Sequence, residues 1–190
     1  MSVPARNARA GILDFLDSHP CDLVVLATHQ NKRMARWFDA SAQRGVLRKA
    51  RTASLFLREA EKGFVDARTG ALSLRTILVP IDDCAASAPA LRRIEARVGL
   101  ISPGARIKLL HVGERAPESI DAQGETLRLP VIARQGPVVE TILKTAADLN
   151  ADMIAMPTAG RHGLIGAVRG STTARVLEDA RWPLVAVPME

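Results

Sequence analysis

The residues of this chain best suited to chemistry form a glycine-rich stretch, PTAGRHGLIGAVRGSTT, at 157–173. Glycine lets backbone N–H groups approach an anion, and a helix that follows adds free N–H groups and the positive end of its dipole. Ser171 could cap such a helix, Thr172 offers a hydroxyl and Arg161 adds positive charge. The combination favours phosphate binding. The stretch contains four glycines: Gly160, Gly163, Gly166 and Gly170.

This local pattern leaves a second interpretation open. The stretch lacks the GK[ST] ending of a P-loop and the GxGxxG spacing of a dinucleotide fingerprint. Glycine and serine are also common where an ordinary loop enters a helix. The stretch by itself is therefore compatible with a flexible loop that ends in a normal N-cap.

Catalytic and metal-binding patterns are not evident in the chain. No Ser-His-Asp or Cys-His grouping can be argued, and the four histidines lack metal-ligand spacing. We interpret His111 as structural because it lies within a predicted strand, whereas His162 in the loop could contact phosphate. Cys21 and Cys84 are far apart, so we expect no disulfide framework and a cytoplasmic location.

The composition points to a globular protein with anionic partners. The net charge is +6, which suits phosphates, nucleotides, nucleic acid or a membrane surface. Nucleic acid is the weaker choice, because aromatic residues make up 3% of the chain and do not interleave with the basic ones. No apolar run approaches the length of a membrane span, and the start of the chain does not resemble a signal peptide.

The elements that must position the glycine stretch alternate between strand and helix from residue 75 onward. Amphipathic spacing, for example Leu91, Ile94 and Val98, indicates helices between the strands. Such alternation predicts a parallel sheet with right-handed crossovers, which binds ligands beyond the carboxyl ends of its strands. The glycine stretch follows the fourth strand at that edge. The predicted strands are 75–81, 105–112, 127–134, 151–156 and 182–188.

The first part of the chain repeats the last part. Residues 21–57 shifted by 130 align without a gap, so that Asp22 falls on Asp152 and Ser41 on Ser171. We interpret 1–57 as the second half of the same unit, without its first three strands.

This organisation divides the chain into a partial domain at 1–57, a polar linker at 58–74 and a complete domain at 75–190. A two-stranded unit cannot bury its own faces, so it should pack on the complete domain or on another subunit. A truncated gene product is the alternative.

Three sequence stretches together resemble the universal stress protein family. They are ILVPIDD at 77–83, LLHV at 109–112 and P-x2-G-x9-G-S-T at 157–172. The resemblance extends over 75–190, and 8–57 resembles the back half of a second such domain. It implies an α/β fold with a five-stranded parallel sheet flanked by helices, of the Rossmann-like, adenine-nucleotide alpha hydrolase-like type. It also implies frequent dimerisation along the last strand.

The resemblance further implies an ATP site, with Mg²⁺ as a possible companion. In the nucleotide-binding branch of the family, G-x2-G-x9-G-[ST] holds ATP. Gly160, Gly170 and Ser171 match its later glycines and its hydroxyl, which face phosphates and ribose. Arg161, Gly163 and Thr172 complete the predicted site within the same stretch.

Three residues outside the glycine stretch also match the family's pattern, two of them at its adenosine contacts. Asp82, at the end of the first strand, matches the acidic residue that lies against the adenosine. Val112, at the end of the second strand, matches the position whose backbone meets adenine. Met156 matches the residue just before the motif.

The chain departs from the family pattern in both copies. Pro157 replaces the first motif glycine, and proline has no N–H and a restricted φ. Asp83 and Cys84 stand where small residues are usual. In the first copy the glycine positions hold Ala27, Gln30 and Ala40, so we expect no nucleotide there.

The sequence thus predicts a universal stress protein that binds ATP or a related adenine nucleotide in 75–190, as a sensor or switch. The alternative is a nucleotide-free protein interaction module of the same fold. Slow ATP hydrolysis is a third hypothesis, for which no base can be named. We expect the last strand, 182–188, to pair with residues 54–57 or with another chain in a homodimer.

Overall fold

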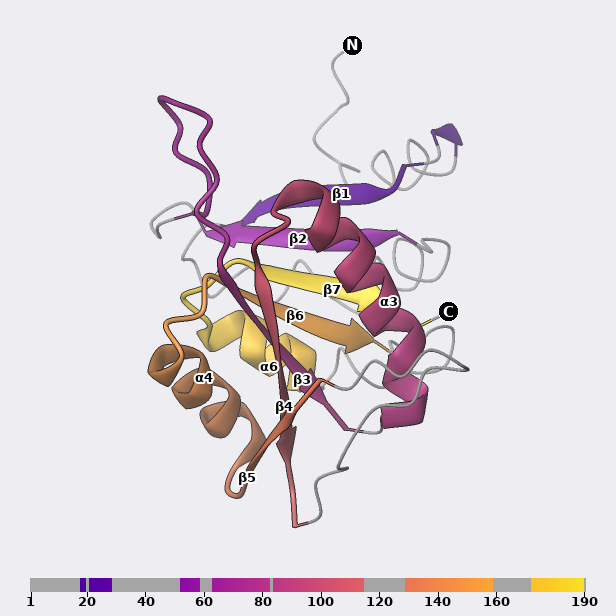
Figure 1. Ribbon diagram of the computed structural model, residues 1–190, viewed down its shortest axis with the longest axis vertical. Coiled ribbons are helices and arrows are strands. Elements are labelled where there is room, and N and C mark those ends of the chain that lie inside the picture. Colours follow the sequence, from indigo (N-terminus) through magenta and orange to yellow (C-terminus); the bar gives the residue numbers. More distant parts are fainter. Residues whose placement is uncertain are drawn as a thin grey trace, which may run out of the picture.

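The computed structural model describes residues 18–19, 21–28, 52–58, 63–82, 84–114, 129–158 and 172–189. Their strands form one seven-stranded sheet in the order β1-β2-β7-β6-β3-β4-β5 (Figure 1). The strands are β1 (Leu23–Thr28), β2 (Ala53–Arg58), β3 (Thr76–Ile81), β4 (Arg106–Val112), β5 (Val131–Arg134), β6 (Met153–Thr158) and β7 (Leu184–Pro188). The helices are α3 (Cys84–Ile101), α4 (Val138–Asp148) and α6 (Thr172–Asp179).

Strands β3 to β7 form the predicted five-stranded parallel sheet. Their apolar, β-branched runs, such as TILVPI in β3, suit strands that are buried on both faces. The first of these strands, β3, lies between β4 and β6, so chain order reverses direction at β3 and β6. β5 begins at Val131, and residues 129 and 130 of the predicted strand 127–134 lie outside it, because Pro130 cannot donate a ladder hydrogen bond. Residues 127 and 128 lie outside the described residues.

Helices cover the two faces of this sheet. Alternate residues of β3 point to opposite faces, so Ile77 packs in the core with Leu91 of α3, whereas Leu78 packs with Ile142 of α4 and Val176 of α6. Figure 1 shows α3 in front of the sheet and α6 behind it. The three-layer α/β architecture predicted from the sequence is therefore present.

The last strand finds its partner within the chain. β7 pairs parallel with β6 on one side and antiparallel with β2 on the other, with Leu55 opposite Val185. This confirms the predicted pairing of 182–188 with 54–57. It also corrects the expectation of a homodimer through the last strand, because both edges of β7 are already hydrogen-bonded.

The strand pairing follows the sequence repeat. Shifted by 130 residues, β1 has the bounds of β6. Leu23 faces Ala53 in the first pair and Ile154 faces Leu184 in the second, so the two parallel pairs share one offset. The same shift takes Leu55 onto Val185, its partner across the β2–β7 ladder. A pseudo-two-fold axis therefore passes between these two residues.

The predicted linker 58–74 is in part an ordered hairpin. Val65 bridges Leu72, and residues 63–74 project beyond the sheet (Figure 1). The Asp66 carboxylate accepts backbone N–H groups from Arg68 at 2.9 Å and Thr69 at 2.8 Å. Gly70 adopts a φ of 70°, a conformation that glycine tolerates without strain. These turn contacts order a segment that composition alone presented as a linker.

Candidate functional site

The candidate site lies where three neighbouring parallel strands end. Asp82 directly follows β3, Val112 ends β4 and Thr158 ends β6. Ile81 faces His111 in the β3–β4 ladder, so the next residues, Asp82 and Val112, lie at the same level. The β3–β6 boundary is the point where strand order reverses, and open α/β sheets bind ligands at such points.

The site residues that the structure describes differ in their exposure to solvent. Asp82 is exposed and Val112 is half-buried, so both can reach a ligand at this edge. Met156 is 5% exposed and packs with Val176 of α6 and with Ala180, which directly follows this helix. Its side chain therefore belongs to the core below the site, and its contact with a nucleotide stays a prediction.

Helix α6 brings its N-terminal end toward the same edge. Thr172 is its first residue and is half-exposed. Because α6 connects the parallel strands β6 and β7, its N-terminus lies on the side where β6 ends, and its free N–H groups are suited to an anion. The other predicted residues of the stretch lie outside the described residues: Gly160, Arg161, Gly163, Gly170 and Ser171.

Arg134 is a charged residue at this edge that the sequence analysis missed. It ends β5 opposite Val112, and its carbonyl accepts the Gly113 N–H at 3.0 Å. Its side chain is exposed, so a cationic group lies one strand away from Val112 and two from Asp82. Arg134 also ends the predicted strand 127–134, so a charged residue at the end of a predicted strand was a signal that could have found it.

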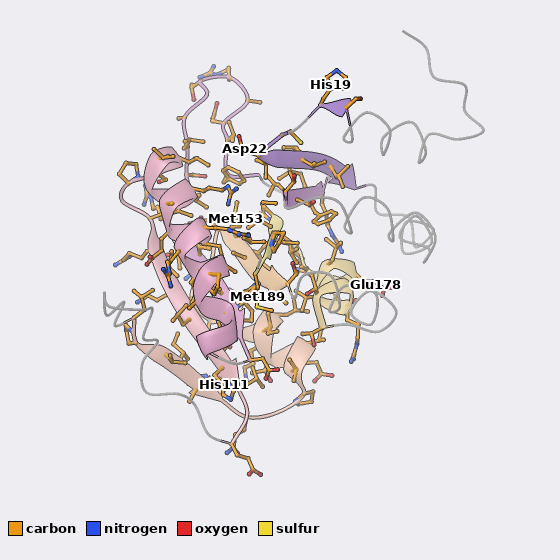
Figure 2. All side chains as sticks on the ribbon, turned by 90° about the vertical axis from the view of Figure 1, so that its right-hand side faces the viewer. His19, Asp22, His111, Met153, Glu178 and Met189 are labelled. Carbon is orange, nitrogen blue, oxygen red and sulfur yellow. The ribbon has the colours of Figure 1, made fainter. Side chains whose placement is uncertain are left out.

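His111 is a buried polar residue just below the edge. It is 9% exposed, and its Nδ1 has no hydrogen-bond partner within the described part of the chain. A Cβ at Gly113 would lie 2.7 Å from its Nε2, so the backbone at 113 approaches the ring closely. Figure 2 shows His111 at the lower end of the molecule, away from Asp22, which directly precedes β1.

Two further kinds of feature are absent from the described residues. No group of three His, Cys, Asp or Glu side chains among them is arranged to hold a metal ion. None of their helices is both long and apolar enough to cross a membrane.

Comparison with known proteins identifies the region around the glycine stretch. Residues 115–188 match the model of the universal stress protein family. The chain contains a universal stress protein domain. The match includes β5, α4, β6, α6 and β7, whereas β3 and β4 lie before it and belong to the same sheet. A comparison with curated proteins finds no match.

Solved structures share this fold at low sequence identity. A universal stress protein from Archaeoglobus fulgidus matches 95% of this chain with a TM-score of 0.67 and 18% identity. The functionally unknown protein PA1789 from Pseudomonas aeruginosa matches 95% with a TM-score of 0.60 and 15% identity. The present chain spans 64% of the Archaeoglobus chain and 67% of the Pseudomonas chain.

A universal stress protein in complex with cAMP matches 62% of this chain, with a TM-score of 0.46 and 15% identity. That likeness is too low to bear on the ligand of the present chain.

Proposed function

We propose that this universal stress protein domain binds ATP or a related adenine nucleotide at the shared ends of β3, β4 and β6, as a sensor or switch. One observation carries the proposal: Asp82 and Val112 lie together at the strand-order reversal, beside the strand that leads into the glycine stretch. These are the two positions that the family resemblance assigns to adenosine.

The chemistry of the edge is compatible with each part of a nucleotide. The exposed Asp82 carboxylate can accept hydrogen bonds from ribose hydroxyls. The N–H groups at the start of α6, with the glycines before it, are suited to phosphates. Arg134 adds a positive charge at the same edge and can offset the charge of Asp82.

Pro157 is the main departure from the family pattern, and its position limits its effect. It lies within β6, opposite Val187 of β7, and β6 continues to Thr158. The missing N–H therefore belongs to a strand residue, and all four glycines of the stretch come after β6 in the sequence. We infer that the phosphate contacts begin after Thr158.

Calorimetry with ATP and Mg²⁺ tests the site directly, together with chromatography of small molecules released from the denatured protein. We expect saturable binding that Gly160→Val abolishes, because a branched side chain blocks close approach of the backbone to phosphate. Gly104→Val is the matched control, since no atom lies within 4 Å of a Cβ at that turn. Equal affinity of the Gly160→Val variant would exclude this site.

A nucleotide-free interaction module is the second candidate function. It is favoured by β1, an edge strand that exposes Leu23 and Val25. Thermal unfolding separates the two functions. A ligand that binds only the folded state raises the melting temperature, so an ATP-binding protein should melt at a higher temperature with excess ATP and Mg²⁺. An interaction module would melt at the same temperature with and without them.

We assign the protein to the cytoplasm, where ATP is available and the exposed, unpaired Cys21 stays reduced.

A further inference from the structure

Within the described chain, strand β1 is paired along one edge only. It pairs with β2 on one side, and no strand of the described chain pairs with the other (Figure 1). Its repeat equivalent, β6, uses the corresponding edge to bind β3 in parallel, with Met153 opposite Ile77. The two copies therefore differ in one respect: the edge that is occupied in β6 is open in β1.

Two apolar side chains of β1 are exposed, whereas the equivalent side chains of β6 are buried. Leu23 is 39% exposed and Val25 is 55% exposed, whereas the equivalent residues of β6, Met153 and Ala155, are 6% and 0% exposed. Val25 is paired with Leu55, so it lies on the sheet face that α3 covers in the complete domain. The open edge thus combines unpaired backbone groups with apolar side chains that a neighbouring strand and helix would bury.

Asp152 shows how the equivalent position receives an incoming strand. Its carboxylate Oδ2 accepts the backbone N–H groups of Arg75 at 2.7 Å and Thr76 at 2.8 Å, and its own N–H donates to the Thr76 carbonyl at 2.8 Å. These contacts hold the first residues of β3 against the start of β6. A single carboxylate therefore sets both the position and the register of the neighbouring strand.

Asp22 occupies the same position at the start of β1. It is exposed, and its carboxylate accepts no hydrogen bond from any residue of the described chain. Figure 2 shows it at the beginning of the edge strand. The acceptor that receives two N–H groups at Asp152 is present here, and no residue of the described chain donates to it.

We propose that the open edge of β1 binds a parallel strand from a partner polypeptide that supplies the front portion of a universal stress protein domain. The incoming strand resembles β3: an apolar, β-branched run whose first two N–H groups bond to Asp22. Its following helix covers Leu23 and Val25. The pseudo-two-fold axis between Leu55 and Val185 carries β3, β4 and β5 to this place beside β1.

A second copy of this chain does not meet these requirements. Its β3 is hydrogen-bonded on both edges, to β4 and β6, and is not free to add to another sheet. The open edges of two β1 strands could pair with each other only about a two-fold axis. The two strands would then run antiparallel, with the end of one β1 beside the start of the other. Two N–H groups at the start of a parallel strand would then not reach Asp22.

The test uses a fluorescently labelled peptide, SLRTILVPID, with the sequence of residues 73–82, titrated with the full chain and followed by anisotropy. We expect saturable binding that falls about tenfold or more in Asp22→Ala and in Val25→Lys. Leu100→Lys is the matched control, because Leu100 is also an apolar side chain and is 86% exposed on α3. The affinity of this variant for the peptide should be unchanged. Circular dichroism melts verify that each variant is folded.

A second peptide isolates the Asp22 contact. N-methylation at its Arg75 and Thr76 positions removes the two N–H donors. The methylated peptide should therefore bind the native chain more weakly than the unmodified peptide does. The Asp22→Ala variant should bind both peptides with the same affinity. No saturable binding up to millimolar peptide, or binding that Val25→Lys leaves intact, overturns the proposal. Light scattering that finds a dimer broken by Val25→Lys also overturns it, because a second copy would then occupy the edge. None of these outcomes depends on nucleotide binding.

Discussion

At the scale of single residues, His111 and Gly113 share one crowded position at the end of β4. The buried ring leaves no room for a Cβ at residue 113, which would lie 2.7 Å from Nε2. We expect Gly113→Ala to destabilise the fold by about 1–3 kcal/mol, because overpacking forces a buried neighbour to move. Urea unfolding measures the change.

A double-mutant cycle separates this clash from an ordinary glycine effect. With the ring removed in His111→Ala, the added methyl group has space, so Gly113→Ala should cost clearly less in that background. Gly104→Ala is the control, since its Cβ would meet nothing within 4 Å. Equal costs of Gly113→Ala in both backgrounds would show that the ring does not limit the site.

Single residues also show how far sequence reasoning reached. Asp82 and Val112 were assigned by resemblance to the family, and the structure places them at one level of two neighbouring strands. Among the described residues the Nδ1 of His111 has no partner, which the sequence could not reveal because it depends on contacts of the ring in space. The burial of Met156 likewise follows from packing against α6, and its contact with a nucleotide stays a prediction.

At the scale of elements, β2 holds the far end of α6. The Arg58 guanidinium donates to the Leu177 carbonyl at 2.9 Å and to the Glu178 carbonyl, in the last turn of the helix. A cation there satisfies free carbonyls and complements the helix dipole. This contact joins the N-terminal strand pair to the glycine-stretch helix.

Arg58→Met should therefore destabilise the fold by about 1–3 kcal/mol, since hydrogen bonds to charged groups are the stronger kind. Arg58→Lys should recover only part of the loss, because the ammonium group keeps the charge but lies on a shorter side chain than the Nη2 that donates to both carbonyls. Thermal unfolding measures both, with Arg92→Met on the exposed side of α3 as the control. A melting temperature unchanged in Arg58→Met would contradict the capping role.

The hairpin 63–74 carries a pH-dependent contact at Asp66. Hydrogen bonds from the Thr69 backbone and side chain, and from the Arg68 backbone, lower the pKa of this carboxyl below its ordinary 3.8. A lowered folded-state pKa means that the stabilisation is present above pH 3.8 and is lost as pH falls through the folded-state value. We expect amide exchange at Arg68 and Thr69 to accelerate only below pH 3.8, after correction for intrinsic rates.

Asp66→Ala should remove this pH dependence and leave both amides fast at every pH. An Asp66 titration midpoint at or above 3.8 by NMR would contradict the assignment. The hairpin was predicted only as a linker because its order comes from one side chain and from Gly70, not from hydrophobic periodicity.

At the scale of the whole molecule, alternation of apolar runs and amphipathic stretches was sufficient to predict the parallel sheet. The β2–β7 ladder was predicted because an apolar last strand needs a partner strand. In the structure β2 is that partner, with Leu55 opposite Val185. The open edge of β1 was not foreseen. Strand order and exposure at Leu23 and Val25 are properties of the assembled sheet, and sequence spacing does not contain them.

The two unequal copies lead to a prediction about stoichiometry. The first copy has Ala27, Gln30 and Ala40 at the glycine positions, and its strand β1 lacks a neighbour equivalent to β3 within the described chain. It therefore has neither the phosphate-binding backbone nor the strand ends for adenosine. We expect calorimetry to give one ATP per chain, and free ATP at 100 times its Kd to add about 2.7 kcal/mol to the unfolding free energy.

The variant Asp82→Ala distinguishes this one-site arrangement from a site in the first copy. It should weaken ATP binding about tenfold or more by removing a charged acceptor for the ribose, whereas Asp22→Ala at the edge strand should leave the affinity unchanged. Because Asp82 is exposed, its removal should alter the melting temperature of the ligand-free protein little. Two ATP per chain, or a loss of affinity in Asp22→Ala, would place nucleotide in the N-terminal copy and contradict the assignment of the two halves.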